Sequence, residues 1–416
     1  VDPCAPGAGS TAEGEGYPGA NALWDASSGT ITLAGASNEV LAFQLVVEQE
    51  AGAVKSLSLE GAGGVKMSVS QNITVPVGGD RWADDPLVPV NLRNFEASFA
   101  ENTKNAPALA GRQRQTFTVE LYIPKGSRPG QRAMKLVVKA AAAEHRLAVA
   151  LQVLGFELPD ENACTADINN YSRVPFTGGI DADTTCAKYL AAQTAYFRIA
   201  REHRALLHIL PYGHSGGIDK NYRPVVTGWG KNRKATDWTA FDRQWSNLLD
   251  GSAFKGSRSG DRPIEYLYTP VNLNFPAHFE NYGKPGFEVE FKTVLHQMAE
   301  HFKEKGWTKT KMEVFFNHKA RWKFFPWDMD EIYYDWDNDA TIGFAKMAIA
   351  ATKDVPGVQF INRIDSSWIF DKSARTEIGD VVQLWVVNRG SHSHSPDEVE
   401  LLRKKGQQIW FYGGAG

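Results

Sequence analysis

The chain has 416 residues, and its 45 Lys and Arg against 48 Asp and Glu give no electrostatic case for a nucleic-acid or other polyanionic partner. Its length exceeds the usual size of one domain and predicts two. No apolar run approaches the length that crosses a membrane, and three cysteines are too few for a disulfide scaffold.

The first 159 residues are predicted to form a β-sandwich domain. Alternating apolar runs at 40–47, 117–123, 134–138 and 147–153 are bounded by Gly, Pro and Asn, and no helical period intervenes. Strands separated by turns in this way favour a sandwich. Residues 1–19 are rich in Gly, Ala, Pro and Ser and have no initiator Met, so we expect a processed protein that is extracellular or periplasmic.

From residue 160 the pattern changes to strand, loop and helix. The predicted strands lie at 166–168, 205–210, 264–268, 312–316, 358–361, 381–387 and 408–411. Amphipathic stretches are clearest at 185–204, 287–305, 338–353 and 396–405. Seven βα units in sequence predict a (β/α)8 TIM-like barrel over residues 160–416, with an open doubly wound sheet as the lesser alternative. The barrel stops after strand seven, so we expect a missing C-terminal segment or a second chain to complete it.

Polar residues follow the predicted strands at their carboxyl ends, where barrel enzymes place their active sites. We therefore expect these residues to share a pocket. The predicted substrate-binding residues are Asn170, Tyr212, His214, Asn274, Asn317, Lys319, Trp327, Asp365, Trp385, Asn388, Trp410 and Tyr412.

Several of these residues have a second interpretation. Lys319 either grips a substrate hydroxyl or carboxylate, or forms a structural salt bridge. Asp365 either binds sugar hydroxyls or pairs with Arg363, two residues earlier. Trp385 and Trp410 are candidates for stacking on a sugar ring, although tryptophan in a barrel strand is more often part of the core.

Asp330 and Glu331 are the candidate catalytic residues. They lie in the aromatic-rich segment 325–331, after the predicted strand at 312–316. Neighbouring acids repel, so in a shielded pocket one can stay protonated while the other is ionised. Sugar hydrolysis needs this combination: a proton donor for the leaving oxygen, and an anion for the developing positive charge. A solvated surface pair or a helix N-terminal charge is the alternative for the dipeptide alone.

Several segments resemble glycoside hydrolase family 123 and its uncharacterised bacterial relatives. The order of β-sandwich, linker and barrel is similar, and so are the runs 38–47, 119–129 and 156–159 of the first domain. In the second domain, the segments 316–319 and 327–331 are similar to the family's region around its acidic pair. The runs 381–387 and 408–412 match the closing strands of its barrel, so the resemblance spans nearly the whole chain.

The resemblance implies a retaining, exo-acting β-N-acetylgalactosaminidase without a cofactor or a metal. The 2-acetamido oxygen of the substrate attacks the anomeric carbon and forms an oxazolinium ion. Asp330 would orient the acetamido group and stabilise that cation. Glu331 would protonate the leaving oxygen and then deprotonate the attacking water. The implied partner is a carbohydrate, either a polysaccharide or a glycoconjugate.

Two features depart from the family pattern. Ile332 stands where the family has Pro after the acidic pair, and about ten residues separate Lys319 from Asp330, which places the pair on a long loop. A glycosidase for a sugar without the acetamido group, with Asp365 as its nucleophile, therefore stays open. A non-catalytic carbohydrate-binding or surface-assembly protein on the same scaffold is a third interpretation.

Metal and disulfide chemistry have weaker signals. Asp335, Asp337 and Asp339 alternate as in a calcium loop, but the turn glycine and the distal Glu of that motif are missing. Charges at a helix N-terminus account better for these acids. Cys164 and Cys186 could pair across about twenty residues, and the sequence leaves this pairing open.

Overall fold

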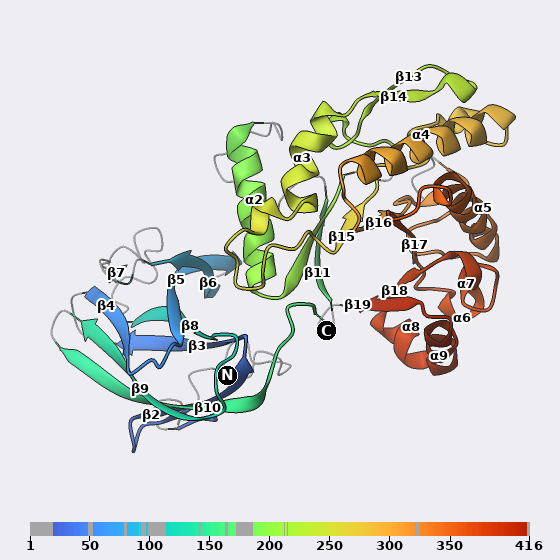
Figure 1. Cartoon of the computed structure of the whole chain (residues 1–416). Helices are drawn as coiled ribbons and strands as arrows, with labels where there is room; N and C mark the ends of the chain where they lie inside the picture. Colours follow the sequence, from blue (N-terminus) through green and yellow to red (C-terminus); the bar gives the residue numbers. More distant parts are fainter. Residues whose placement is uncertain are drawn as a thin grey trace. The chain divides into compact units, whose positions relative to one another are not determined.

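The computed structural model describes residues 20–48, 53–78, 81–90, 92, 97–98, 114–140, 143–162, 165–171, 186–211, 213, 215–320 and 325–413. The chain divides into two compact units, Val1–Glu161 and Asn162–Gly416 (Figure 1). In its described residues the first unit is built of strands, and the second of strands and helices. The prediction of a β domain followed by an α/β domain is confirmed.

The described residues of the N-terminal unit form two β-sheets. One sheet has the order β1 (Trp24–Asp25), β2 (Thr30–Ser37), β10 (Glu144–Glu157), β9 (Gly130–Ala140), β4 (Ala53–Glu60) and β7 (Ala97–Ser98). The other has the order β3 (Glu39–Glu48), β8 (Arg114–Ile123), β5 (Lys66–Gly78) and β6 (Arg81–Pro89). Neighbouring strands are antiparallel except β2 and β10, which are parallel.

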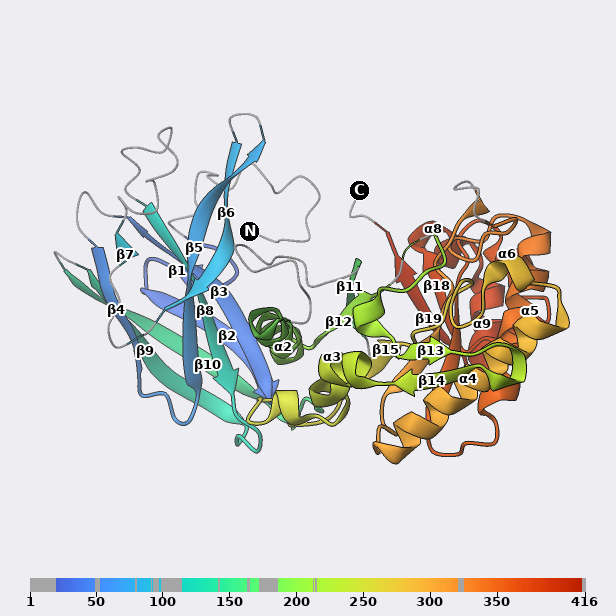
Figure 2. The ribbon, with the colours of Figure 1, turned by 90° about the horizontal axis from the view of Figure 1, so that it is seen from above.

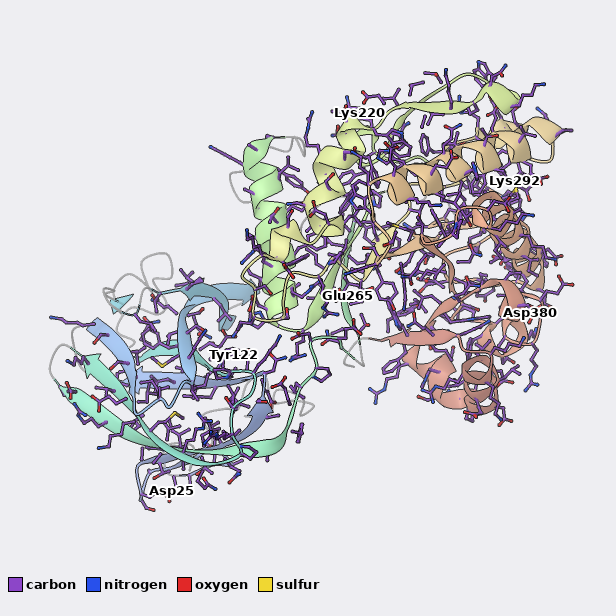
Figure 3. All side chains as sticks on the ribbon, viewed as in Figure 1. Asp25, Tyr122, Lys220, Glu265, Lys292 and Asp380 are labelled. Carbon is purple, nitrogen blue, oxygen red and sulfur yellow. The ribbon has the colours of Figure 1, made fainter. Side chains whose placement is uncertain are left out.

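One hydrophobic core joins these two sheets. On β8, the alternate residues Phe117, Val119, Leu121 and Ile123 belong to one buried cluster, as expected for the face of a strand that packs on a core. They belong to the same buried cluster as residues of the other sheet, such as Leu136 of β9. Figure 3 shows the side chains that crowd the space between the sheets.

Seven parallel strands in the described part of the C-terminal unit form its framework, and each overlaps a predicted strand. They are β11 (Ala166–Tyr171), β12 (Ala205–Leu210), β15 (Tyr266–Tyr268), β16 (Lys311–Val314), β17 (Gln359–Asp365), β18 (Leu384–Asn388) and β19 (Gln408–Tyr412). β11 pairs with β12, and β15 to β19 form a five-stranded sheet in chain order. The connection between β12 and β15 also contains a hairpin of β13 (Val225–Thr227) and β14 (Lys234–Asp237).

The four predicted helices of this unit are confirmed. They are α2 (Ala187–Glu202), α4 (Pro285–Glu304), α5 (Asp335–Thr352) and α9 (Pro396–Lys404). Further helices are α3 (Thr239–Leu249), α6 (Phe370–Ser373), α7 (Ile378–Val381) and α8 (Arg389–His394), with 3-10 turns η2 (Lys220–Tyr222), η3 (Gly230–Asn232), η4 (Ser252–Phe254) and η5 (Phe279–Asn281). Helix α5 packs beside α4 and β17, and α9 packs beside β19 (Figures 1 and 2). None of the helices in the described ranges is long and apolar enough to span a membrane.

Helix α4 shows how the sequence selects a buried face. Phe291, Val294, Met298 and Phe302 are all fully buried, and their spacing of three or four residues places them on one side of the helix. Pro285 occupies the first turn, where its missing N–H has no helical partner to lose. The helix therefore begins at the proline and packs by its apolar stripe.

We expect Val294→Ala to destabilise the C-terminal unit by about 2–3 kcal/mol, because it removes buried methyl groups and leaves a cavity. Val289→Ala on the same helix is the matched control, since Val289 is 37% exposed, and its effect should stay within about 0.5 kcal/mol. Urea-induced unfolding of both variants measures the difference. Equal effects at the two positions would contradict the packing of α4 described here.

Candidate active site

The carboxyl ends of the parallel strands carry several of the predicted site residues. Parallel strands bring these ends to the same edge of a sheet. The residues at or just beyond the strand ends are Asn170 on β11, Asn317 and Lys319 after β16, Asp365 on β17, Asn388 on β18 and Tyr412 on β19. Tyr212 and His214 lie outside the described residues.

The acidic pair lies beside the end of β16 in spite of the length of its loop. The backbone N–H groups of Met329 and Asp330 donate to the carbonyl of His318 over 3.2 and 3.1 Å. The carboxylate of Asp328 accepts the backbone N–H of Ala320 and closes the same turn. The loop therefore leaves the strand and returns to it before the pair begins.

Two buried apolar side chains hold the loop on either side of the pair. Met329 packs into the core that includes β16 and α4, and Ile332 packs into the cluster that includes β18 and α7. The backbone N–H of Ile332 also donates to the carbonyl of Asp365 over 3.0 Å. A proline, which the resemblance leads us to expect at this position, has no N–H to donate. Ile332 thus ties the acidic pair to the end of β17.

Glu331 has a strained backbone. Its φ is 57°, in the left-handed region that residues with a side chain rarely adopt. Such a conformation costs on the order of 1–2 kcal/mol, which the anchors on either side must offset. Strained backbone of this kind clusters at functional sites.

Lys319 lies against both carboxylates of the pair. Its Nζ is 3.6 Å from Oδ2 of Asp330 and forms a closer ion pair with Oε2 of Glu331. The Tyr412 hydroxyl donates to Oε1 of Glu331 over 2.7 Å and lies 2.8 Å from the hydroxyl of Ser367. Each oxygen of Glu331 therefore faces a hydrogen-bond donor, the arrangement that suits an ionised carboxylate.

Asp330 is the more buried member of the pair, and its charge is disfavoured. Burial raises the pKa of Asp330 to about 7, and the negative charge of Asp365 adds to this effect. Lys319 opposes the rise, and Glu331 contributes to it. Near neutral pH Asp330 therefore still carries a proton in a large fraction of molecules.

Asp365 pairs with Arg363, the second of its two predicted interpretations. Nε of Arg363 lies 3.0 Å from Oδ1 of Asp365 and Nη2 lies 3.4 Å from Oδ2, and both side chains are buried. Nη1 of Arg363 also donates to the Tyr268 hydroxyl over 2.6 Å and to Oε2 of Glu313 over 3.1 Å. Because both oxygens of Asp365 face the guanidinium, this carboxylate is poorly placed to attack a sugar.

The network around Arg363 extends to the first strands of the unit. Nε2 of His208 lies 3.5 Å from Oε1 of Glu313, and its Nδ1 lies 3.3 Å from Oδ2 of Asp167. The His208 ring stacks on that of Tyr268, with the centroids 4.0 Å apart. Burial raises the pKa of Glu313, against the attraction of His208 and Arg363. Polar side chains from β11, β12, β15, β16 and β17 thus meet in one buried network.

The prediction that Trp385 stacks on a sugar is wrong. Its side chain is fully buried in the cluster that packs under the helices, 5.7 Å from Phe370 between ring centroids. Its Nε1 donates to Oε1 of Gln407 over 2.6 Å. The neighbours Leu384 and Val386 belong to a different cluster, so the alternation of β18 turns Trp385 toward the helices.

Two predicted asparagines form hydrogen bonds to backbone groups of the surrounding loops. Asn274 donates from Nδ2 to the carbonyl of Ser215 over 3.1 Å and accepts the backbone N–H of Phe279 over 3.0 Å. Oδ1 of Asn388 accepts the backbone N–H of Ser391 over 2.7 Å and caps α8. Both side chains position backbone in the structure.

The remaining candidates differ in burial. Asn317 is fully buried and Asn170 is half-buried. Trp327 is half-buried among other aromatic rings, and its ring centroid lies 4.8 Å from that of Tyr282. The ring centroid of Trp410 lies 4.9 Å from that of Tyr266. Both tryptophans therefore have aromatic partners within the fold.

Sequence reasoning did not assign a site role to Asp337 or Ser367. Asp337 lies fully buried in the first turn of α5, where its carboxylate accepts the backbone N–H groups of Asp328, Tyr333 and Tyr334 over 3.1, 3.2 and 2.8 Å. The prediction of a helix N-terminal charge is confirmed for Asp337, but this residue also fixes both sides of the acidic loop. An Asp or a Ser close to a candidate site is too common a signal to single out either residue.

Metal and disulfide sites receive no support from the described residues. Among them, no group of three or more His, Cys, Asp and Glu side chains is placed to hold a metal ion. Cys164 lies outside the described residues, and so does its predicted pairing. The sulfur of Cys186 accepts the backbone N–H of Tyr189 over 3.3 Å at the start of α2.

The fold is similar to that of a family 123 glycoside hydrolase from Clostridium perfringens, whose structure was solved in a study of glycolipid glycan hydrolysis. The TM-score is 0.54 at 12% sequence identity, and the match covers 92% of this chain and 67% of that one. The resemblance is confirmed at the level of the fold.

Two further solved structures, a predicted α-galactosidase and a predicted α-galactosidase/melibiase from Bacteroides fragilis, match with TM-scores of 0.27. They are 9% and 10% identical to this chain, and the matches cover 86% of it and 55% and 56% of theirs. These two scores are too low to carry an argument. No protein-family model matches the chain, and no curated protein matches its sequence.

The raised pKa of Asp330 predicts how stability depends on pH. The pKa in the folded protein is about 7 against an ordinary value of 3.8, so between these pH values the folded state binds the proton more strongly than the unfolded chain. Stability therefore falls as the pH rises through this window. We expect Asp330→Asn to remove the penalty and to gain about 2–4 kcal/mol over wild type at pH 8, and much less at pH 4.

Denaturant unfolding at a series of pH values measures this effect. Asp339→Asn is the matched control, because Asp339 is an exposed aspartate on α5. Its stability difference from wild type should not change over the same pH range. A pH-independent difference for Asp330→Asn would contradict the charge state assigned to Asp330.

Arg363→Met should destabilise the C-terminal unit by about 3–5 kcal/mol, because it leaves two buried carboxyls, Asp365 and Glu313, without their cation. The exposed Arg403 on α9 provides the control, and Arg403→Met should change stability by no more than about 0.5 kcal/mol. Thermal or urea unfolding measures both. A small effect at Arg363 would show that the network does not hold the strands together.

Proposed function

We propose that the protein is a glycoside hydrolase of the family 123 type that removes a terminal sugar from a polysaccharide or glycoconjugate. The observation that supports this best is the pair of neighbouring carboxyls, Asp330 and Glu331, in unlike surroundings beside the strand ends. Asp330 is buried with a pKa of about 7, while Glu331 is more exposed and bound by donors. Two carboxyls in different protonation states are what acid-assisted sugar cleavage requires.

The proposed substrate carries a β-linked N-acetylhexosamine, with N-acetylgalactosamine as the first candidate. Its 2-acetamido oxygen acts as the internal nucleophile, so the reaction retains the anomeric configuration. Asp330 orients the acetamido N–H and stabilises the oxazolinium ion. Glu331 protonates the leaving oxygen and later takes the proton of the attacking water. This division of roles comes from the family resemblance, and Asp365, held by Arg363, is left without a role as nucleophile.

The charge state of the unliganded site adds one step to this scheme. Without substrate, Asp330 carries a proton in a large fraction of molecules near neutral pH, whereas Glu331 must hold a proton to act as the acid. The acetamido N–H, once it donates to Asp330, favours the ionised form of that carboxyl and releases its proton. We propose that Glu331, which shares the ammonium group of Lys319 with Asp330, accepts this proton.

The finer architecture is also part of the proposal. Two sheets around one core suit a β-sandwich, and parallel strands that follow one another in chain order suit a TIM-type barrel. In such a barrel the buried network around Arg363 occupies the interior, below the acidic pair. The sandwich and the barrel are thus the architecture that we propose for the two units.

Hydrolysis of a panel of aryl β-glycosides, with and without a 2-acetamido group, tests the proposal. We expect turnover of N-acetylhexosaminides only, with kcat/KM falling above about pH 7 as the proton of Asp330 is lost. Glu331→Gln should lower kcat/KM on a phenyl glycoside by about 10²–10⁴-fold, because the leaving oxygen is no longer protonated. A dinitrophenyl glycoside needs no proton at its leaving group, so Glu331→Gln should slow its cleavage far less. Asp330→Asn should impair both substrates.

Glu300→Gln serves as the control, because Glu300 is an exposed glutamate on α4, and it should retain wild-type activity within about twofold. Cleavage only of sugars that lack the acetamido group would contradict the substrate-assisted mechanism. If no glycoside in the panel is cleaved while oligosaccharides still bind, the protein is a carbohydrate-binding protein on a glycosidase scaffold.

A further inference from the structure

Three exposed aromatic side chains follow the acidic pair closely in the chain, and a fourth comes from the loop after β17. Tyr333, Tyr334 and Trp336 follow Glu331 almost directly and are 49%, 44% and 56% exposed. Trp368, on the loop after β17, is 61% exposed. We call these four residues the aromatic shelf.

The rings of the shelf form a continuous string. The Trp336 and Tyr334 rings are stacked with their centroids 4.3 Å apart, and those of Tyr334 and Tyr333 are 4.8 Å apart. Tyr333 then lies 5.9 Å from Trp368, which comes from a different loop. Residues 32 positions or more apart in sequence are thus brought together to expose one apolar surface.

The shelf is fixed to the acidic pair from two sides. The buried carboxylate of Asp337 accepts the backbone N–H groups of Tyr333 and Tyr334, and so holds the segment that directly follows the pair. On the other side, Trp368 follows Ser367, whose hydroxyl lies 2.8 Å from that of Tyr412, and Tyr412 donates to Glu331. The position of the shelf relative to Glu331 is therefore set by the fold.

Clustered exposure of this kind is characteristic of a binding surface. Single exposed apolar side chains are ordinary on protein surfaces, whereas contiguous ones mark sites of interaction. Trp229 provides the contrast within the same unit. It is as exposed as Trp368, but its ring neighbours are the His278 ring and the guanidinium of Arg233. The shelf has four rings at the edge of the acidic site.

The chemistry of the shelf suits a neutral sugar chain. Aromatic faces stack on the apolar C–H faces of pyranose rings, and tyrosine hydroxyls and the tryptophan N–H supply hydrogen bonds at the rim. The segment 331–337 contains Glu331, Asp335 and Asp337 and no Lys or Arg. Anionic lipid surfaces attract basic residues, so an acidic segment disfavours them.

We propose that the aromatic shelf binds the sugar residues of a neutral glycan that lie beyond the one whose bond is cleaved. This inference rests on the proposed function for its location, since the glycan must extend from the acidic pair. The shelf makes the protein selective for extended glycans over single sugars. A substrate with several sugars should therefore bind more tightly than a simple glycoside of the same terminal sugar.

Binding to the Glu331→Gln variant, followed by calorimetry, tests the proposal without turnover. The probes are the methyl β-glycoside of N-acetylgalactosamine and a neutral tetrasaccharide that ends in the same sugar. A methyl group replaces the usual aryl group because an aryl ring could itself stack on the shelf. We expect the tetrasaccharide to bind at least about tenfold more tightly, as one or two stacked rings provide. Adding Trp336→Ala or Trp368→Ala should remove this advantage, whereas adding Trp229→Ala should preserve it.

Three outcomes would overturn the proposal: equal affinities for the two probes, no binding of the tetrasaccharide, or shelf variants that bind it as tightly as their parent. Neutral phosphatidylcholine vesicles form a separate arm, and binding to them that Trp336→Ala abolishes would assign the shelf to a lipid surface instead. Hydrolysis of aryl glycosides by the wild type tests the proposed function independently. If the wild type cleaves none of the glycosides while the tetrasaccharide still binds through the shelf, the proposed function is wrong. The assignment of the shelf as a glycan-binding surface is retained in that case.

Discussion

The guanidinium of Arg363 is the group on which the carboxyl edge of the C-terminal unit depends. It is buried, and it contacts Asp365 on its own strand, Glu313 on β16 and Tyr268 on β15. Apolar strands alone would leave these two carboxyls without a partner, and an unpaired buried charge is far more costly than a paired one. The arginine therefore links three neighbouring strands by charge as well as by the backbone ladder. It also holds Asp365, whose carbonyl accepts the N–H of Ile332 and so fixes the acidic loop.

The acidic pair is positioned mainly by its neighbours' backbone. His318 accepts from Asp330, Asp365 accepts from Ile332, and Asp337 accepts from the amides before and after the pair. Hydrogen bonds of this kind fix the segment without using the carboxyls of Asp330 and Glu331, which face Lys319 and Tyr412 instead. A site that is fixed before the substrate arrives loses less entropy when the substrate binds.

The helices and strands could be predicted where the apolar residues recur with a single helical or strand spacing. The apolar stripe of α4 and the alternation of β8 each have one buried face, and both segments were assigned correctly from sequence. β18 was harder, because a strand in a parallel sheet is covered on both faces and is apolar throughout. Its sequence therefore does not show that Trp385 packs against the helices, whereas Val386 packs against residues of neighbouring strands such as Leu206 and Tyr266.

The site could be predicted only where the type of a residue and its place after a strand indicated a function. The neighbouring acids and their place after a strand identified Asp330 and Glu331 as candidates, and the polar strand ends identified Lys319 and Tyr412, which contact Glu331. The return of the loop to His318 depends on tertiary hydrogen bonds that no local pattern encodes. The network from Asp167 to Asp365 joins residues far apart in sequence, although Glu313 and His208, polar residues inside apolar strands, were a usable signal.

The left-handed backbone of Glu331 places the demands of folding and of chemistry in opposition at one position. Glycine adopts this conformation without steric cost, so the fold by itself would favour glycine there. Under the proposed function, selection on the carboxylate of Glu331 opposes a change to glycine. If the proposed function holds, residue 331 marks evolutionary history among descendants of this chain: lineages that abandon catalysis are free to change it to glycine, and lineages that retain catalysis are not.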